Sequence, residues 1–105
     1  MVDSPLFKNN AISSLAADIT AGSLTISLSA GDGALFPAPD VYEYAVLTLR
    51  NIATNTREIV HCTGRTSDTL TIERGQESTT PAAFSAGDEV SMQITAGLLE
   101  YLRDN

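Results

Sequence analysis

Apolar and polar residues alternate along much of this 105-residue chain, which is the pattern typical of β-strands. In residues 23–29, Leu24, Ile26 and Leu28 alternate with threonine and serine, so we expect these three apolar side chains on one buried face. Four more segments of strand length follow: 41–50, 57–63, 69–74 and 89–95. Short polar turns separate the first three of these, which predicts that they form an antiparallel meander.

The segment 57–63 differs from an ordinary surface strand, because each of its faces mixes apolar and polar residues. The two faces are Glu58, Val60 and Cys62 on one side and Arg57, Ile59 and His61 on the other. This mixture predicts a strand that lies between two surfaces. Residues 30–39 contain two glycines, an aspartate and two prolines, so we expect a loop from which Leu35 and Phe36 reach the core.

Residues 96–103 are expected to form a short helix that begins after an N-cap at Thr95. Four apolar residues fall mostly on one side of this helix: Leu98, Leu99, Tyr101 and Leu102. Isolated helices shorter than about 12–15 residues are unstable in water, so this one has to dock. The apolar stripe is therefore either an assembly interface with another subunit or a cover for the chain's own sheet, and the sequence leaves both open.

Together these elements predict an all-β fold, a small antiparallel β-sandwich or barrel-like domain with a short C-terminal helix. A chain of this length supports only one modest core. We expect an extended N-terminal arm over residues 1–20, a β domain over 21–95, and a C-terminal helix and tail over 96–105.

Composition and charge argue against several classes of partner. The chain has 6 Lys and Arg against 13 Asp and Glu, a net charge of -7, and its basic residues are scattered, so we expect no nucleic-acid binding. No segment approaches the roughly 20 apolar residues that cross a bilayer, and residues 1–8 lack the pattern of a signal peptide, so we expect no membrane association. The single cysteine, Cys62, cannot form an internal disulfide.

Candidate catalytic and metal-binding residues are few, and we expect none of them to form a site. His61 and Cys62 are neighbours on a strand, so their side chains point to opposite faces and cannot form a nucleophile–base pair. Acid–base chemistry would have to draw on carboxylates that lie beside turns: Glu73, Glu77, Asp88 and Glu89. Calcium would find only one local carboxylate at each of Asp32 and Asp88. We therefore expect no catalytic residue, no cofactor and no metal.

Several motifs together resemble small virion proteins of tailed phages and prophages, including the N-terminal attachment domains of tail fibres. The matching runs are the alternating strand 24–28, Phe36-Pro37, Arg57-Glu58-Ile59-Val60, 64–71, and 74–88, which opens with Arg74-Gly75-Gln76-Glu77. The similarity extends over about residues 11–102. One position departs from the pattern, because the family usually has glycine after the glutamate and this chain has Ser78.

The resemblance implies a β-rich structural module that works by protein–protein assembly and carries no catalytic residues. The implied location is the virion, assembled in the host cytoplasm, with other virion proteins as partners and a homo-oligomeric state. The leading interpretation is a tail or baseplate-proximal attachment module for fibres. The alternatives are a capsid decoration (cement) protein on the major capsid lattice and, less favoured, a small hydrolase or carbohydrate-binding module.

Some residues of the matching runs are expected to fix loops or turns: Arg74, Glu77, Asp88 and Phe84. Arg57 and Arg65 are candidates for interface or loop-fixing roles as well. A pairing of Arg74 with Glu77 across the turn would be one such structural role.

Overall fold

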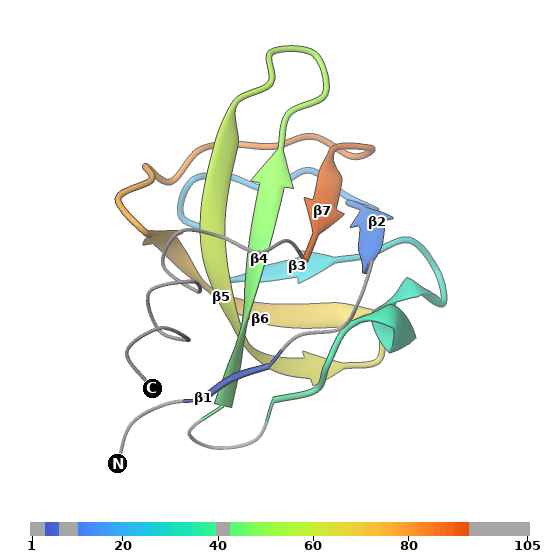
Figure 1. The fold of residues 1–105 in the computed structure, drawn as a ribbon. Helices are drawn as coiled ribbons and strands as arrows, with labels where there is room; N and C mark the ends of the chain where they lie inside the picture. Colours follow the sequence, from blue (N-terminus) through green and yellow to red (C-terminus); the bar gives the residue numbers. More distant parts are fainter. Residues whose placement is uncertain (1–3, 7–10, 40–42, 93–105) are drawn as a thin grey trace.

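The computed structural model describes residues 4–6, 11–39 and 43–92, which form a mostly antiparallel β-protein (Figure 1). The elements are β1 (Ser4–Leu6), β2 (Ile12–Ser14), β3 (Thr25–Ser27), the 3-10 helix η1 (Asp32–Leu35), β4 (Glu43–Arg50), β5 (Arg57–Thr66), β6 (Thr69–Gln76) and β7 (Glu89–Ser91). The predicted all-β class is confirmed. The expected helix over 96–103, with Leu98, Leu99, Tyr101 and Leu102, lies outside the described residues. No helix in the described ranges has the length and apolar character that a bilayer span requires.

The strands belong to one curved sheet in the order β2-β7-β4-β5-β6-β3, and β1 adds to β4 in parallel. The two ends of this order meet at an antiparallel bridge between Leu15 and Leu28. Backbone hydrogen bonds flank the bridge, from Ala16 N to Ser27 O at 2.8 Å and from Ser29 N to Ser14 O at 3.0 Å. The sheet therefore curls around the core, as Figure 1 shows.

The predicted meander is present as β4, β5 and β6. β4 and β5 pair from Ala45 opposite Cys62 to Arg50 opposite Arg57. The register of β5 against β6 shifts twice, between Ile59 and His61 and between Cys62 and Gly64. Such bulges bend a strand and increase its twist, which allows one long strand to run through both halves of a curled sheet.

The core follows the alternation of the strands, with a few exceptions. Ile26, Leu28 and Phe36 are buried as expected. The predictions for Leu24 and Leu35 are wrong, because these side chains are 64% and 46% exposed. Leu24 directly precedes β3, and its carbonyl still accepts a hydrogen bond from Ile72 N at 2.9 Å although its side chain is not covered. Leu35 ends the single turn of η1.

The chain before β3 also contributes to the curled sheet. β2 pairs with β7, and Ala11, Leu15 and Ile19 belong to the buried core. Ile12 is 55% exposed. Residues 11–20 of the expected N-terminal arm thus supply both a strand and core side chains.

Candidate functional site

The most unusual group in the structure is the Glu58 carboxylate, which is fully buried at the start of β5. Its side chain points inward because it is in phase with Val60 and Cys62, both of which belong to the core. An ionised carboxylate away from water is very costly unless it is paired and hydrogen-bonded. Glu58 therefore requires a dedicated set of partners.

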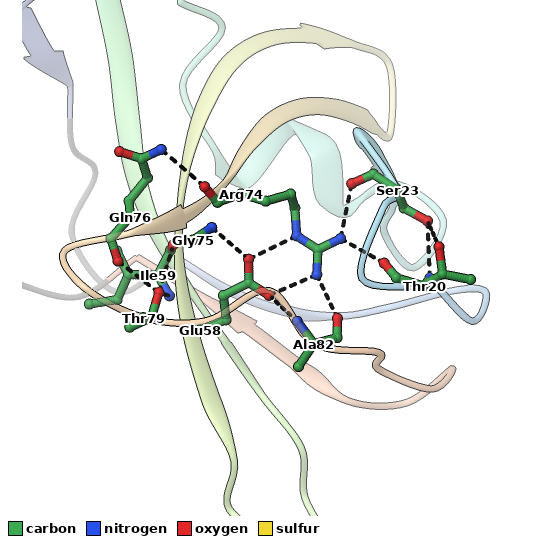
Figure 2. Close-up of polar contacts among 9 residues, drawn as sticks. All are labelled: Thr20, Ser23, Glu58, Ile59, Arg74, Gly75, Gln76, Thr79 and Ala82. Atoms are coloured by element: carbon green, nitrogen blue, oxygen red, sulfur yellow. Dashed lines mark hydrogen bonds and ion pairs between the residues drawn. The ribbon is translucent and has the colours of Figure 1, made fainter.

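Arg74 on β6 supplies the charge partner in a two-pronged contact (Figure 2). Its Nε donates to Oε2 of Glu58 at 2.8 Å, and its Nη2 donates to Oε1 at 2.7 Å. Two backbone amides complete the carboxylate's shell, Gly75 N at 2.9 Å and Ala82 N at 3.0 Å. Each carboxylate oxygen thus accepts two hydrogen bonds, which offsets the cost of burial.

The remaining N–H groups of Arg74 bind loop carbonyls. Nη1 donates to Thr20 O at 2.7 Å and to Ser23 O at 2.9 Å, and Nη2 donates to Ala82 O at 2.6 Å. With the two bonds to Glu58, every N–H of the guanidinium has an acceptor. We call Glu58, Arg74 and the backbone groups that they bind the Glu58–Arg74 network. It joins β5 and β6 to the 20–23 turn and to the loop after β6 (Figure 2).

The surroundings of Glu58 act on its pKa in opposite directions. Burial raises the pKa, whereas the hydrogen bonds from Arg74, Gly75 and Ala82 and the charge of Arg74 lower it, and the net effect is a pKa below the ordinary value. The carboxylate therefore stays ionised at neutral pH. It is a fixed charge in the framework rather than a proton donor.

The turn that follows Arg74 is built on left-handed backbone conformations. Glu77 and Ser78 have φ values of 53° and 67°, in the region that favours glycine. Ser78 thus stands in a backbone conformation that glycine adopts without strain. Thr79 secures the turn, because its Oγ1 donates to Gln76 O at 2.7 Å and accepts from Ile59 N at 3.0 Å (Figure 2).

The structure corrects the expected pairing of Arg74 with Glu77. Arg74 turns inward to Glu58, which lies on the neighbouring strand, and all its donors are used there and on loop carbonyls. The half-buried Glu77 lies in the turn itself. A buried carboxylate is the stronger competitor for a guanidinium, because it has no water to replace the cation.

Asp68 holds a second close contact, between the β5–β6 turn and residues 31–33 at the start of η1. Its carboxylate accepts from Gly31 N at 3.0 Å and from Gly33 N at 2.8 Å, and these bonds lower its pKa. Gly33 is required here, since a Cβ on it would lie 2.0 Å from Ser67 O. The sequence shows only a short polar turn between residues 63 and 69, which does not predict this role for Asp68.

Asp88 and Phe84 both hold the chain ahead of β7. The Asp88 carboxylate, 7% exposed, accepts from Ile52 N at 3.2 Å and from Ser85 N at 2.8 Å. Phe84 is buried, and its backbone pairs with Ile19 in both directions, at 2.8 and 3.1 Å. These contacts tie the loop before β7 to the β4–β5 loop and to the segment after β2.

The two candidate residues for nucleophilic chemistry lie on opposite faces of β5. Cys62 is buried in the core, where burial raises the pKa of its thiol, and its Sγ donates to Gly64 O at 3.3 Å. His61 is half-buried on the other face and stacks on Tyr44, with ring centroids 4.4 Å apart. The geometry therefore gives Cys62 and His61 no contact through which one could activate the other.

The carboxylates proposed for acid–base or metal chemistry are dispersed. Glu73 is exposed on β6, and Glu89 on β7 pairs with Arg50 at 3.2 Å. Asp32 accepts a hydrogen bond from Ser13 Oγ at 2.7 Å. Across residues 11–39 and 43–92, no group of three histidine, cysteine or carboxylate side chains is close enough to hold a metal ion.

The two remaining arginine candidates are on β5. Arg57 is exposed beside the β4–β5 loop, and the half-buried Arg65 donates from Nη1 to Ser67 O at 3.2 Å. Arg65 thus contacts the turn that Asp68 fixes.

No protein-family model matches the chain, and a search of curated proteins gives no significant match.

Proposed function

We propose that this chain is a non-enzymatic structural component of a tailed-phage virion, a tail or baseplate-proximal attachment module for fibres that works by protein–protein assembly. The observation that carries the proposal is the Glu58–Arg74 network. Its two charged residues lie in the Arg57-Glu58-Ile59-Val60 and Arg74-Gly75-Gln76-Glu77 runs, which are the sequence signals of the resemblance.

The use of these polar groups supports a structural role. A catalytic or ligand-binding group needs atoms that can reach a substrate. Glu58 instead accepts hydrogen bonds from two backbone amides as well as from Arg74. The guanidinium of Arg74 donates its other hydrogen bonds to loop carbonyls. The motif therefore serves to hold loops in fixed positions, as an attachment module requires.

The loops held in this way come from separate parts of the chain. Arg74 fixes the 20–23 turn, Asp68 fixes residues 31–33, and Asp88 fixes the β4–β5 loop at Ile52. Rigid loops bind a partner with less loss of conformational entropy than mobile loops do. Loops held in this way suit docking to a partner protein.

Quantitative mass spectrometry of purified virions tests the proposal. We expect the chain in the particle at a copy number that matches a single tail, with labelling by a specific antibody at the tail or baseplate. A copy number that matches the major capsid lattice would instead establish the decoration role. Absence from the particle would overturn both.

A separate assay tests the enzymatic alternative. Purified protein would be incubated with glycan substrates, beside His61→Ala and Glu77→Gln variants that retain the wild-type melting temperature. We expect no turnover by any of the three. Turnover by the wild type that either substitution abolishes would contradict the proposal.

A further inference from the structure

The pairing of β2 with β7 continues beyond the ends of both strands. Leu15 N donates to Asp88 O at 2.9 Å, and Gly87 N donates to Leu15 O at 2.8 Å. Farther along, Ile19 and Phe84 exchange two backbone hydrogen bonds, at 2.8 and 3.1 Å. The segment after β2 and the segment before β7 thus form an irregular ladder that ends beyond the Ile19–Phe84 bridge.

Arg74 holds both sides of this ladder at its far end (Figure 2). Its Nη1 donates to Thr20 O, one residue beyond the bridge on the first side, at 2.7 Å. Its Nη2 donates to Ala82 O, two residues beyond the bridge on the other side, at 2.6 Å. The same guanidinium is fixed by Glu58 of β5 through Nε and Nη2. One buried ion pair therefore joins the end of the ladder to the meander.

Other hydrogen bonds mark where the part held by Arg74 begins and ends. Leu24 O accepts from a β6 amide at 2.9 Å, and Thr79 Oγ1 accepts from a β5 amide at 3.0 Å, so the chain at these two positions is tied to the meander directly. Among the described residues, the stretches 18–23 and 82–86 are bonded to β5 and β6 only through the Glu58–Arg74 network. We call these two stretches the clamped segment.

The clamped segment has hydrogen bonds of its own that hold its two stretches together. Besides the bridge, Ala86 N donates to Asp18 Oδ1 at 2.8 Å. Within the first stretch, Thr20 N donates to Ser23 Oγ at 3.0 Å. These bonds do not involve the ion pair, so they persist when it breaks. The two stretches therefore move together rather than separately.

We propose that the Glu58–Arg74 network is a latch, and that the clamped segment opens as one unit when the ion pair breaks while the meander stays folded. Opening uncovers the side chains of Ile19 and Phe84, which are 8% and 2% exposed in the closed form. Their burial favours the closed form at neutral pH. The latch is a second conformation of this chain and does not rest on the proposed virion role.

Acid is the change that releases the latch. A protonated Glu58 no longer balances the charge of Arg74, whose side chain is 6% exposed in the closed form, whereas water solvates this cation in the open form. Arg74 is the one charged group among the described residues that bonds to Glu58. The adjoining stretches 20–23 and 79–84 contain no ionisable side chain.

The direction of the pH dependence follows from the two forms. In the closed form the pKa of Glu58 lies below its ordinary value, because burial, which raises it, is outweighed by the bonds from Arg74 and two backbone amides. In the open form the pKa returns to about 4.3. The open form therefore gains up to about tenfold in population for each unit that pH falls below about 4.3, until the pH reaches the pKa of the closed form.

Native-state hydrogen exchange of the wild-type chain, followed by NMR, tests whether the segment opens separately. The amides of Ile19, Ala82 and Phe84 report on the clamped segment, and central amides of β4 and β5 report on the meander. We expect the three amides to share one protection factor, roughly tenfold or more below that of the meander. Three different protection factors would mean independent fraying, and protection equal to that of the meander would mean no separate opening. Either result would overturn the latch.

Two matched substitutions test the part played by the ion pair. Glu58→Gln removes the buried carboxylate charge, and Glu89→Gln removes the charge of the surface pair with Arg50. At neutral pH we expect the clamped segment of Glu58→Gln to lose protection by roughly tenfold or more while the meander remains the better protected part. We expect no change in Glu89→Gln. Unchanged protection in Glu58→Gln, or the same loss in both variants, would contradict the latch.

Exchange measured from pH 6 to about pH 3 tests the release by acid. We expect opening of the clamped segment in the wild type to increase below about pH 4.3. Asp18 and Asp88 also accept hydrogen bonds in or beside the segment, so a shallower increase in Glu58→Gln isolates the contribution of Glu58. Opening that is independent of pH in the wild type would overturn the release by acid, and this measurement stands even if Glu58→Gln does not fold.

Discussion

Two arginine–glutamate pairs join neighbouring strands of this sheet, one inside the protein and one at its surface. Arg74 and Glu58 meet at 2.7 and 2.8 Å, with side chains 6% and 0% exposed. Arg50 and Glu89 meet in a similar fork at 3.2 and 3.3 Å, with side chains 27% and 25% exposed. The residue types and the cross-strand geometry are alike, so the difference lies in the surroundings.

The surroundings decide what each pair contributes. Glu58 and Arg74 are cut off from water and rely on amides and carbonyls of distant loops as well as on each other. Beside the direct contact, Arg50 donates a long hydrogen bond to Asn55 Oδ1 at 3.4 Å, and water can replace Glu89. The comparison teaches that an ion pair organises a fold when its charges have no alternative to their protein partners.

Removal of one carboxylate charge from each pair gives the largest expected difference. Glu58→Gln leaves Arg74 as a buried, uncompensated cation, and we expect a loss of about 3–5 kcal/mol in the free energy of unfolding. The matched variant Glu89→Gln exposes a cation that water can solvate, so its loss is a small fraction of that. Urea denaturation at neutral pH measures both. Equal losses in the two variants would show that burial does not separate the pairs.

Acid produces a smaller effect of the same origin. The pKa of Glu58 is lower in the folded protein than in the unfolded chain, where it is about 4.3, so the unfolded chain takes up the proton first. The stability that this group contributes is therefore complete above that pH and is lost as pH falls through the lowered folded pKa.

Denaturation curves from pH 7 down to about pH 3 measure this loss. We expect a shallower decline in Glu58→Gln than in the wild type. Part of the decline remains in the variant, because the pKa of Asp68 is also lowered by the amides of Gly31 and Gly33. Identical pH slopes would rule out a proton-linked role for Glu58.

The smallest expected effect concerns the loop beside each pair. Ser78, after the buried pair, and Asn55, after the surface pair, both have left-handed φ values, 67° and 61°. This conformation strains serine by about 1–2 kcal/mol. Glycine relieves this strain, but the greater flexibility of the unfolded chain with glycine offsets part of the gain in stability. Ser78→Gly should therefore stabilise the protein by about 0.5–1 kcal/mol.

Asparagine tolerates the left-handed region, so Asn55→Gly should leave stability nearly unchanged. Thermal unfolding of the two variants beside the wild type compares them. Destabilisation by Ser78→Gly would mean that the serine side chain contributes more than its backbone strain costs.

The local part of the fold could be predicted because it depends on neighbours in sequence. Alternation and polar turns are enough to place β4, β5 and β6 and to pair them as a meander. The three-residue strands β1 and β2 give no such signal, since their positions depend on pairing with β4 and β7. Leu24 shows the limit of periodicity, because its carbonyl still accepts a hydrogen bond from Ile72 N of β6 while its side chain is 64% exposed.

Only part of the candidate site could be predicted from the sequence. Glu58 could be placed on the same face as Val60 and Cys62, and a carboxylate in phase with core residues signals a buried charge that needs a cation. The sequence does not show which arginine pairs with Glu58, because the pairing with Arg74 depends on the register of β5 against β6. The loop-fixing role of Asp68 was harder still to predict, because its partners Gly31 and Gly33 lie far away in sequence.

The way the sheet closes has a consequence for the kinetics of folding. Hairpins of the meander join near neighbours, whereas Ile12 meets Ser91 from almost the opposite end of the described chain. Loop-closure entropy disfavours such distant pairings until other contacts have formed, so the meander assembles first. The pairing of β2 with β7 is then the step that limits the rate of folding. The lifetime of partly folded molecules with unpaired strand edges depends on how quickly this pairing occurs.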